Sequence, residues 1–291
     1  MIGHTFNFLK YRVPAAFFSL AFIGAGVAGY MYHGGFRYSV DFTGGTQVMF
    51  KFSKPVGSEA LKAALSKSGW EDAVTREFGN DVVVVRVKQT ADDAAGLATK
   101  IKMALESSFD DTTATISEVN AVGPGTGAEL SKNFILMISF GLLLMFLYIA
   151  FRFWSFSYGL GALVALLHDP LAILSVIAML NTEISPTVIC AMIAALGYSI
   201  NDTIVIFARI RECFSTAKPG DSPVHIVNDS LNQTLSRTIL TSFATLLVVA
   251  SLFFFGGESL KNFALALMVG IVMGTYSSIF VASPIMLLFR R

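Results

Sequence analysis

Long runs of apolar residues dominate the chain and alternate with shorter polar stretches. Six such runs lie at about 13–32, 132–151, 157–180, 186–208, 238–256 and 262–289. Each reaches the roughly 20 residues that a helix needs to cross a hydrocarbon core of about 30 Å. Pro170 interrupts the third run, which membrane helices tolerate when neighbours satisfy the freed carbonyl. The pattern therefore predicts an α-helical membrane protein with six transmembrane helices, the last five of them within 132–291.

A polar segment of domain size, about 38–128, separates the first two apolar runs. Four of its stretches are predicted to be strands, at 46–52, 73–78, 81–88 and 113–122, and the first of them alternates apolar and polar residues. Two others, 58–67 and 92–107, have helical spacing. The predicted order is βαββαβ, which is the ferredoxin-like pattern. We expect one α+β domain here, which could bind an extended chain at a sheet edge or serve as a rigid docking module.

The basic residues beside the spans predict the orientation of the chain. With the N-terminus inside, the inner ends carry Lys10, Arg12, Arg152, Arg209, Arg211, Lys218, Arg237, Arg290 and Arg291. The short outer connections carry only Lys261. This distribution follows the positive-inside rule, which leaves long translocated segments out of the count. We expect a multi-pass protein of the cell inner membrane. Both termini, including residues 1–12, and a loop at about 209–236 should lie in the cytoplasm, and the 38–128 domain should lie in the periplasm.

The first apolar run also has an alternative interpretation as a cleaved signal peptide. Lys10 and Arg12 precede it, and small residues lie near Ala28 and Gly29. The run is long for a signal peptide, however. Its removal would also leave five spans with the basic residues on the wrong side of the membrane. An uncleaved anchor is therefore the preferred interpretation.

Composition agrees with a membrane protein and narrows the chemistry. Charged residues make up 14% of the chain, against about 25% in soluble domains. The net charge of +1 gives no indication of nucleic-acid binding. Two cysteines, Cys190 and Cys213, cannot build a disulfide framework or a metal site. Without GxSxG, HExxH or a protease-like aspartate pair, an intramembrane hydrolase is disfavoured, and we expect neither an enzyme nor a cofactor.

Asp202 is the most informative polar residue because it lies deep in the fourth apolar run. A carboxylate there costs about 2.5–3.5 kcal/mol on insertion scales, which marks a functional-site candidate. Arg237, on the neighbouring antiparallel span, is the candidate partner. Counted from the outer helix ends, the two residues lie roughly 22 Å and 28 Å deep, about one helical turn apart. Pairing would offset the desolvation of both charges, either in a proton-coupling site or in a static pair that fixes helix register.

A second intramembrane carboxylate, Asp169, follows His168 in the third run. The two could form a proton relay, since imidazole titrates near neutrality. Adjacent helix residues point about 100° apart, however, so Asp169 could instead satisfy polar groups near the Pro170 break. Asn201 and Thr203 could line the same hydrated path. Ser199, Thr234 and Thr241 are further candidates, for which ordinary interhelical hydrogen bonding is the favoured interpretation.

Short sequences on or beside successive spans point together to one family. They are VDFTGGT (40–46), AVGPGTGAEL (121–130), ALLHDPLAIL (165–174), GYSINDTIVIFARIRE (197–212), LNQTLSRTILTS (231–242) and GTYSSIFVASP (274–284). Each is weak alone, but all six in this order resemble the SecF family, the six-span subunit of the Sec protein-export accessory complex. One position departs from the pattern. The family usually has Asp where this chain has Ala208, so no role is carried onto Ala208.

The resemblance implies partners and an energy source. The partners are SecD, the SecYEG channel and an exported, unfolded polypeptide, and the energy source is the proton-motive force. It further implies that Asp202 and Arg237 couple proton movement to translocation. Burial favours the neutral acid and a nearby guanidinium favours the carboxylate, so a small change in geometry would switch its protonation. The membrane field supplies about 2.3 kcal/mol per charge per 100 mV, enough to bias a rearrangement of the spans.

One other function class stays open at this point. An exporter of small molecules or lipids of the resistance–nodulation–division type shares intramembrane Asp chemistry and outer domains of related fold. Six spans with one outer domain would form half of such a proton-driven pump, so a partner half would still be required.

Overall fold

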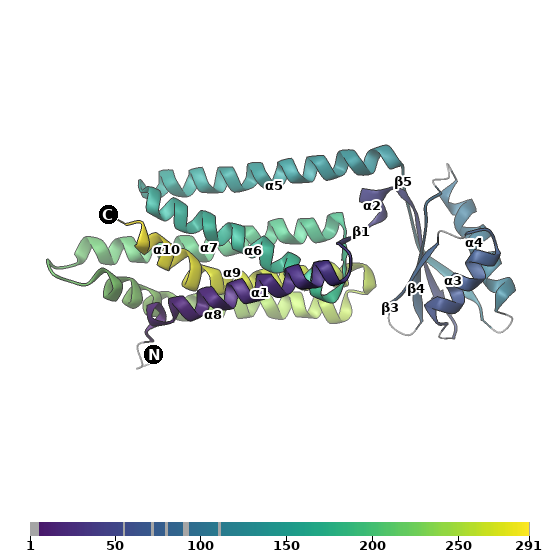
Figure 1. Ribbon diagram of the computed structural model, residues 1–291. Helices are drawn as coiled ribbons and strands as arrows, with labels where there is room; N and C mark the ends of the chain where they lie inside the picture. The colour runs from purple at the N-terminus through teal and green to yellow at the C-terminus, as the bar shows by residue number, and fades with distance from the viewer. Residues whose placement is uncertain are drawn as a thin grey trace. The chain divides into compact units, whose positions relative to one another are not determined.

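The computed structural model describes residues 6–54, 56–70, 73–78, 81–89, 93–109 and 112–290. The chain divides into two compact units (Figure 1). One is a helical unit formed by Met1–Arg37 and Leu136–Arg291, and the other is a sheet-containing unit formed by Tyr38–Ile135.

The described part of the chain contains six helices long and apolar enough to cross a membrane, which confirms the predicted six-helix membrane fold. The first comprises the 3-10 helix η1 (Phe8–Tyr11) and α1 (Arg12–Tyr32). The next four are α5 (Pro124–Phe153), α6 (Phe156–Leu180), α7 (Pro186–Thr216) and α8 (Pro223–Phe255). The sixth combines α9 (Glu258–Ser277), the π-helix η2 (Ser278–Ala282) and α10 (Ser283–Leu288). Two-residue strands, β1 (Arg37–Tyr38) and β6 (Glu183–Ile184), follow α1 and α6.

Prolines affect the third and sixth spans differently. α6 continues as one helix through Pro170. In the sixth span, the backbone changes to π geometry directly before Pro284, which lies in the first turn of α10. Proline has no N–H to donate to the carbonyl four residues earlier, so the regular hydrogen-bond ladder cannot continue there. The Ser283 hydroxyl donates instead to the Ser278 carbonyl at 3.0 Å.

The connection between the fourth and fifth spans is more helical than hydropathy indicates. α7 continues to Thr216 and α8 begins at Pro223, so residues 217–222 alone separate them within the stretch of about 209–236 that was expected to be a loop. Val227 and Leu231 on this part of α8 are buried in the core at this end of the bundle. Helical periodicity, rather than continuous hydrophobicity, therefore extends both helices beyond their apolar runs.

Close packing of α7 against α9 fixes the part of the bundle that carries Asp202. A Cβ atom added at Gly274 of α9 would lie 2.7 Å from the Cβ of Ser199 on α7. Gly270, one turn earlier, faces Ala195 in the same way. Small residues let two membrane helices approach until their backbones nearly touch. Polar groups on this face of α7 are therefore held close to α9.

The sheet-containing unit has the element order predicted from the sequence. A short helix, α2 (Val40–Thr43), comes first. The strands are β2 (Gly45–Phe52), β3 (Val74–Phe78), β4 (Val82–Val87) and β5 (Ala114–Val122), and the helices are α3 (Ser58–Lys67) and α4 (Ala94–Ser108). Asp92, the predicted first residue of the second helix, lies outside the described residues. The sheet order is β3-β4-β2-β5 with antiparallel neighbours, and α3 and α4 cover one face (Figure 1).

Two successive glycines begin the sheet. Gly44 and Gly45 have φ values of 73° and 114°, which L side chains rarely adopt. A Cβ atom at Gly45 would also lie 2.6 Å from the Val87 carbonyl oxygen on β4. Position 45 therefore needs glycine both for its backbone conformation and for the close approach of the neighbouring strand.

Candidate functional site

Asp202 lies inside the helical unit and contacts hydroxyl groups from neighbouring helices. Its side chain is 3% exposed. The Ser242 hydroxyl of α8 donates to Asp202 Oδ2 at 3.5 Å, and Ser242 Oγ lies 2.6 Å from Thr275 Oγ1 of α9. The Tyr198 hydroxyl of α7 donates to Ser242 Oγ at 3.3 Å. The Ser242 hydroxyl on α8 thus connects the buried carboxyl to polar groups on α7 and α9, and we call these four residues the Asp202 cluster.

Arg237 and Asp202 form no ion pair in the part of the chain that the structure describes. The Arg237 side chain is exposed. On α8 the buried stripe passes through Thr234, Thr238 and Ser242. Arg237 lies about 140° around the helix from Ser242, so it points away from that stripe. The expected direct pair is therefore absent from this conformation.

Thr238 occupies a special place on the buried stripe of α8. Its side chain is 1% exposed. Among the described residues, its Oγ1 is buried and has no hydrogen-bond partner. The free hydroxyl lies one helical turn from Ser242 and next to Arg237 in sequence. Along α8, an unsatisfied polar group thus stands between Arg237 and Ser242, the residue that contacts Asp202.

A second buried network surrounds Asp169, whose side chain is fully buried. The Ser199 hydroxyl of α7 donates to Asp169 Oδ2 at 2.5 Å, and His168 Nδ1 lies 3.2 Å from Asp169 Oδ1. His168 Nε2 lies 3.1 Å from Ser19 Oγ of α1, which lies 3.1 Å from the Tyr276 hydroxyl of α9. His168 and Asp169 therefore share one site although they are adjacent on α6. We call these five residues the Asp169 cluster.

The two clusters meet α7 at neighbouring positions. Ser199 and Asp202 are three residues apart, so they lie on one face of the helix. Thr203 is buried, and its hydroxyl donates to the Ser199 carbonyl at 3.1 Å, within α7 itself. Asn201 is exposed on the surface of the helical unit and does not share this face. Of the candidate path residues, the structure brings together Asp169, His168 and Ser199.

The hydroxyls that complete the clusters were partly missed by sequence reasoning. Thr234 and Thr241 each donate to backbone carbonyls of their own helix, and Thr241 is exposed. Ser242, adjacent to Thr241, is the one that contacts Asp202. The helical spacing from Thr234 through Thr238 to Ser242 carries the signal that identifies it. Thr275, Tyr276 and Ser19 have no comparable signal, because their roles depend on which helices pack together.

Comparisons with protein families and solved structures agree on one assignment. The SecD/SecF C-terminal model for protein-export membrane proteins matches residues 100–291, and the SecD/SecF GG motif matches residues 30–56, which include Gly44 and Gly45. The protein translocase subunit SecF of Endomicrobium trichonymphae is 36% identical over 91% of this chain and 84% of its own. SecF of Pseudomonas aeruginosa is 38% identical over 97% of this chain and 91% of its own.

A solved structure is similar over nearly the whole chain. The crystal structure of SecDF, a translocon-associated membrane protein from Thermus thermophilus, matches with a TM-score of 0.88 and 34% identity over 98% of this chain. The chain spans 38% of that longer protein. The relatives do not favour the alternative of half a small-molecule or lipid exporter. With its six apolar helices, this integral membrane protein belongs to the SecF family of protein translocase subunits.

Proposed function

We propose that the chain works with SecD and uses the proton-motive force to help unfolded polypeptides cross the inner membrane after they enter SecYEG. The similarity to SecDF supports SecD as the partner, because the chain matches 38% of that protein and leaves the rest for a second component. The association of SecDF from Thermus thermophilus with a translocon supports the link to the channel. The relatives are named as translocase subunits, which supports a role in transport rather than catalysis.

The observation that carries the proposal is the burial of Asp202 among hydroxyls without a direct cationic partner in the described part of the chain. An ionised carboxylate in such a place is costly unless hydrogen bonds or a nearby cation compensate for its lost hydration. A hydroxyl can donate to a carboxylate or accept from a carboxylic acid, so Ser242 suits both protonation states. A path for protons needs this tolerance, whereas a static ion pair does not.

We infer that Arg237 pairs with Asp202 in a second conformation, when the acid has lost its proton. Movement of the guanidinium toward the carboxylate would offset the cost of the buried charge. The path from Arg237 to the Asp202 cluster passes Thr238, whose hydroxyl has no partner among the described residues. In this proposal the Asp169 cluster, with His168, supplies a further step in the proton path. Thr203 contributes through its bond to the Ser199 carbonyl, and Asn201 faces the partner subunit or lipid.

The sheet-containing unit is proposed to be a periplasmic domain with a ferredoxin-like fold. Its βαββαβ order and antiparallel β3-β4-β2-β5 sheet support this class. The excess of Lys and Arg beside the opposite ends of the spans supports cytoplasmic termini and a periplasmic location for this unit. Its edge strands, β3 and β5, could receive an extended segment of the exported chain.

The decisive experiment compares secretion into inverted membrane vesicles with and without a proton gradient. Asp202→Asn removes the proton site with almost no change in volume, and Arg237→Ala removes the proposed partner. Both are expected to fold, to co-purify with SecD and to lose the gradient-dependent part of secretion and proton flux. Asp221→Asn is the matched control, because Asp221 is exposed in the short connection between α7 and α8. Unchanged coupling in Asp202→Asn would instead support a static role.

A further inference from the structure

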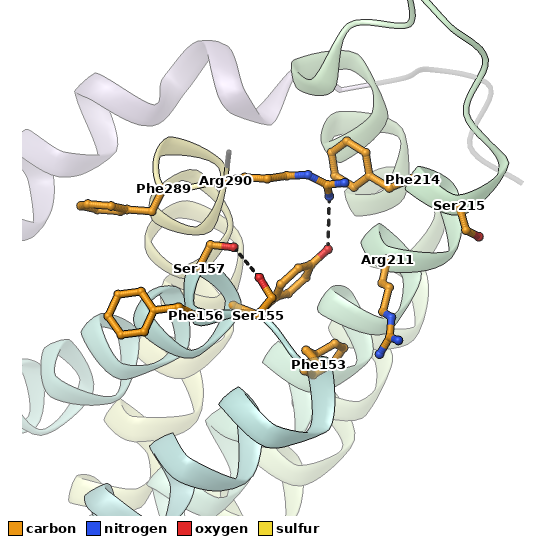
Figure 2. A pocket seen from close by; sticks show the side chains of 10 residues that line it. Phe153, Ser155, Phe156, Ser157, Arg211, Phe214, Ser215, Phe289 and Arg290 are labelled. Carbon is orange, nitrogen blue, oxygen red and sulfur yellow. Dashed lines mark hydrogen bonds between the residues drawn. The ribbon is translucent and has the colours of Figure 1, made fainter.

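A cavity of about 750 Å³ lies at the end of the helical unit where the α5–α6 corner approaches the ends of α7 and α10. Figure 2 shows Arg211 and Arg290 among the side chains around it, together with the serines Ser155, Ser157 and Ser215. Arg211 comes from α7 and Arg290 follows α10, while Ser155 and Ser157 begin α6. None of the residues that line the cavity belongs to the Asp202 cluster or the Asp169 cluster, so the site is separate from the proposed proton path.

Neither arginine of the cavity is neutralised by a carboxylate in the described part of the chain. Arg290 Nη1 donates to the Tyr158 hydroxyl at 3.4 Å, and its guanidinium lies 3.2 Å from the centre of the Phe214 ring (Figure 2). Arg211 Nη1 donates to the Arg152 carbonyl at 3.3 Å. These contacts orient both side chains but leave both positive charges uncompensated. By contrast, Arg209, two residues from Arg211, pairs with Glu212 at 2.6 Å.

The beginning of α6 adds hydrogen-bonding groups to the same cavity. Ser155 is the N-cap residue, but its side chain does not cap the helix. Its hydroxyl lies 2.9 Å from the hydroxyl of Ser157 (Figure 2). The positive end of the α6 dipole thus adds to the charge of the two arginines. Planar guanidinium groups, hydroxyls and this positive field are together the chemistry that binds phosphate.

We infer that this cavity binds the phosphate group of an anionic phospholipid. Two features favour a lipid over a soluble phosphate compound. The cavity lies at the ends of membrane spans, and large apolar side chains beside it are exposed, including Trp154, Phe156 and Phe289. An aromatic and basic border of this kind is typical of the interface between hydrocarbon and headgroups. On the proposed topology the site faces the cytoplasmic leaflet, whose anionic lipids attract basic segments.

The chain provides its own probe for this site, because Trp154 is one of only two tryptophans. In a Trp70→Phe background, the fluorescence of Trp154 reports the lipids beside the cavity. The full chain is placed in bilayers that mix phosphatidylglycerol and phosphatidylcholine, with bromine on the acyl chains of one or the other. Quenching should show a preference for phosphatidylglycerol of about tenfold, since each basic residue at the surface strengthens binding severalfold.

Matched variants decide whether the cavity causes that preference. Arg211→Gln combined with Arg290→Gln should lower the preference to about one, whereas Arg209→Gln should keep it. Arg211→Lys combined with Arg290→Lys retains both charges and should keep most of the preference. Because this variant changes the same two positions, it shows that the double Gln variant loses lipid binding rather than its fold. A preference that survives in the double Gln variant, or is absent from the wild type, overturns the proposal. Displacement of phosphatidylglycerol by millimolar inorganic phosphate would also overturn it, by assigning the site to a soluble phosphate.

Discussion

Thr238 carries the most specific information at the scale of single residues. Its buried hydroxyl lacks a partner among the described residues. Removing a hydrogen-bonding group from water without replacing the bond costs about 1–3 kcal/mol. Such a cost is tolerated where another state of the protein uses the group. Thr238 is next to Arg237 on α8 and one helical turn from Ser242, so the proposed movement of the guanidinium toward Asp202 could use its hydroxyl.

Replacing Thr238 with valine separates stability from function. Thr238→Val keeps the shape of the side chain. It should raise the free energy of unfolding by about 1 kcal/mol, because an unsatisfied buried hydroxyl is removed. Gradient-dependent secretion in vesicles should nevertheless fall. Thr241→Val is the matched control, since Thr241 is exposed and bonds to its own helix. A Thr238→Val protein that secretes normally would argue against any role of this hydroxyl in coupling.

Asp169 gives a second prediction at this scale. Ser199→Ala should leave α7 intact, because the Ser199 backbone carbonyl still accepts from Thr203. It removes the donor to Asp169 Oδ2, so the acid is left with the His168 contact. If the Asp169 cluster lies on the path, we expect proton flux to fall about tenfold or more, because removal of a hydrogen bond to a charged group costs about 1.5–3 kcal/mol. Flux measurements on reconstituted vesicles test this. Wild-type flux would assign the cluster to structure alone.

At the scale of helices, the α7–α9 contact determines how the two clusters are held. Gly274 leaves no room for a side chain beside Ser199. The two residues after Gly274 on α9 each belong to one cluster: Thr275 contacts Ser242 of α8, and Tyr276 contacts Ser19 of α1. A helix displaced by even a fraction of a turn would separate these hydroxyls from both carboxyls.

Gly274→Ala tests this arrangement. The added methyl group must displace α9 or the Ser199 side chain, so we expect a loss of about 1–3 kcal/mol in stability, as for other overpacked interfaces. Gly141→Ala, on α5 with open space around it, should be neutral or slightly stabilising because alanine favours helix. Thermal unfolding in detergent measures both. If the two substitutions had the same effect on stability, α9 would be able to move away from Ser199 without a loss of stability.

Element prediction from the sequence succeeded where burial follows a simple period. The four strands and the helices α3 and α4 of the sheet-containing unit were located within one or two residues, whereas the short helix α2 was not predicted. The end of α7 and the beginning of α8 were not located as closely, because both helices continue beyond their apolar runs on an amphipathic stripe. Asp202, His168 and Asp169 stood out as polar groups in apolar segments. Ser242 and Thr275 could not be identified in this way, because hydroxyl side chains are common in membrane helices and their roles depend on the helices that pack around them.

At the scale of the whole molecule, the chain has two distinct regions of chemistry in one helical unit. The carboxyl clusters lie between packed helices, whereas the arginine cavity lies at the bundle end among exposed aromatic rings. The proposed orientation assigns that end to the cytoplasm. The native cysteines make this assignment testable without a new probe, because Cys213 lies near the end of α7 and is partly exposed.

Thiol labelling should therefore depend on the side of the membrane. In a Cys190→Ala background, a membrane-impermeant maleimide should label Cys213 in inverted vesicles but not in intact spheroplasts. Ser107→Cys, on the exposed surface of α4, should show the opposite pattern when Cys213 is also replaced by alanine. Labelling of Cys213 from outside would reverse the proposed topology.

The π-helix before Pro284 has a consequence for how distant parts of the sixth span are related. A π turn holds one residue more than an α turn. If that extra residue were absorbed back into regular helix, the segment beyond it would rotate by about 100° and advance by about 1.5 Å relative to α9. Thr275 and Tyr276 precede this point, and Arg290 follows it. A single local change of winding would thus re-aim the arginine that caps the bundle while the buried hydroxyls stay where they are.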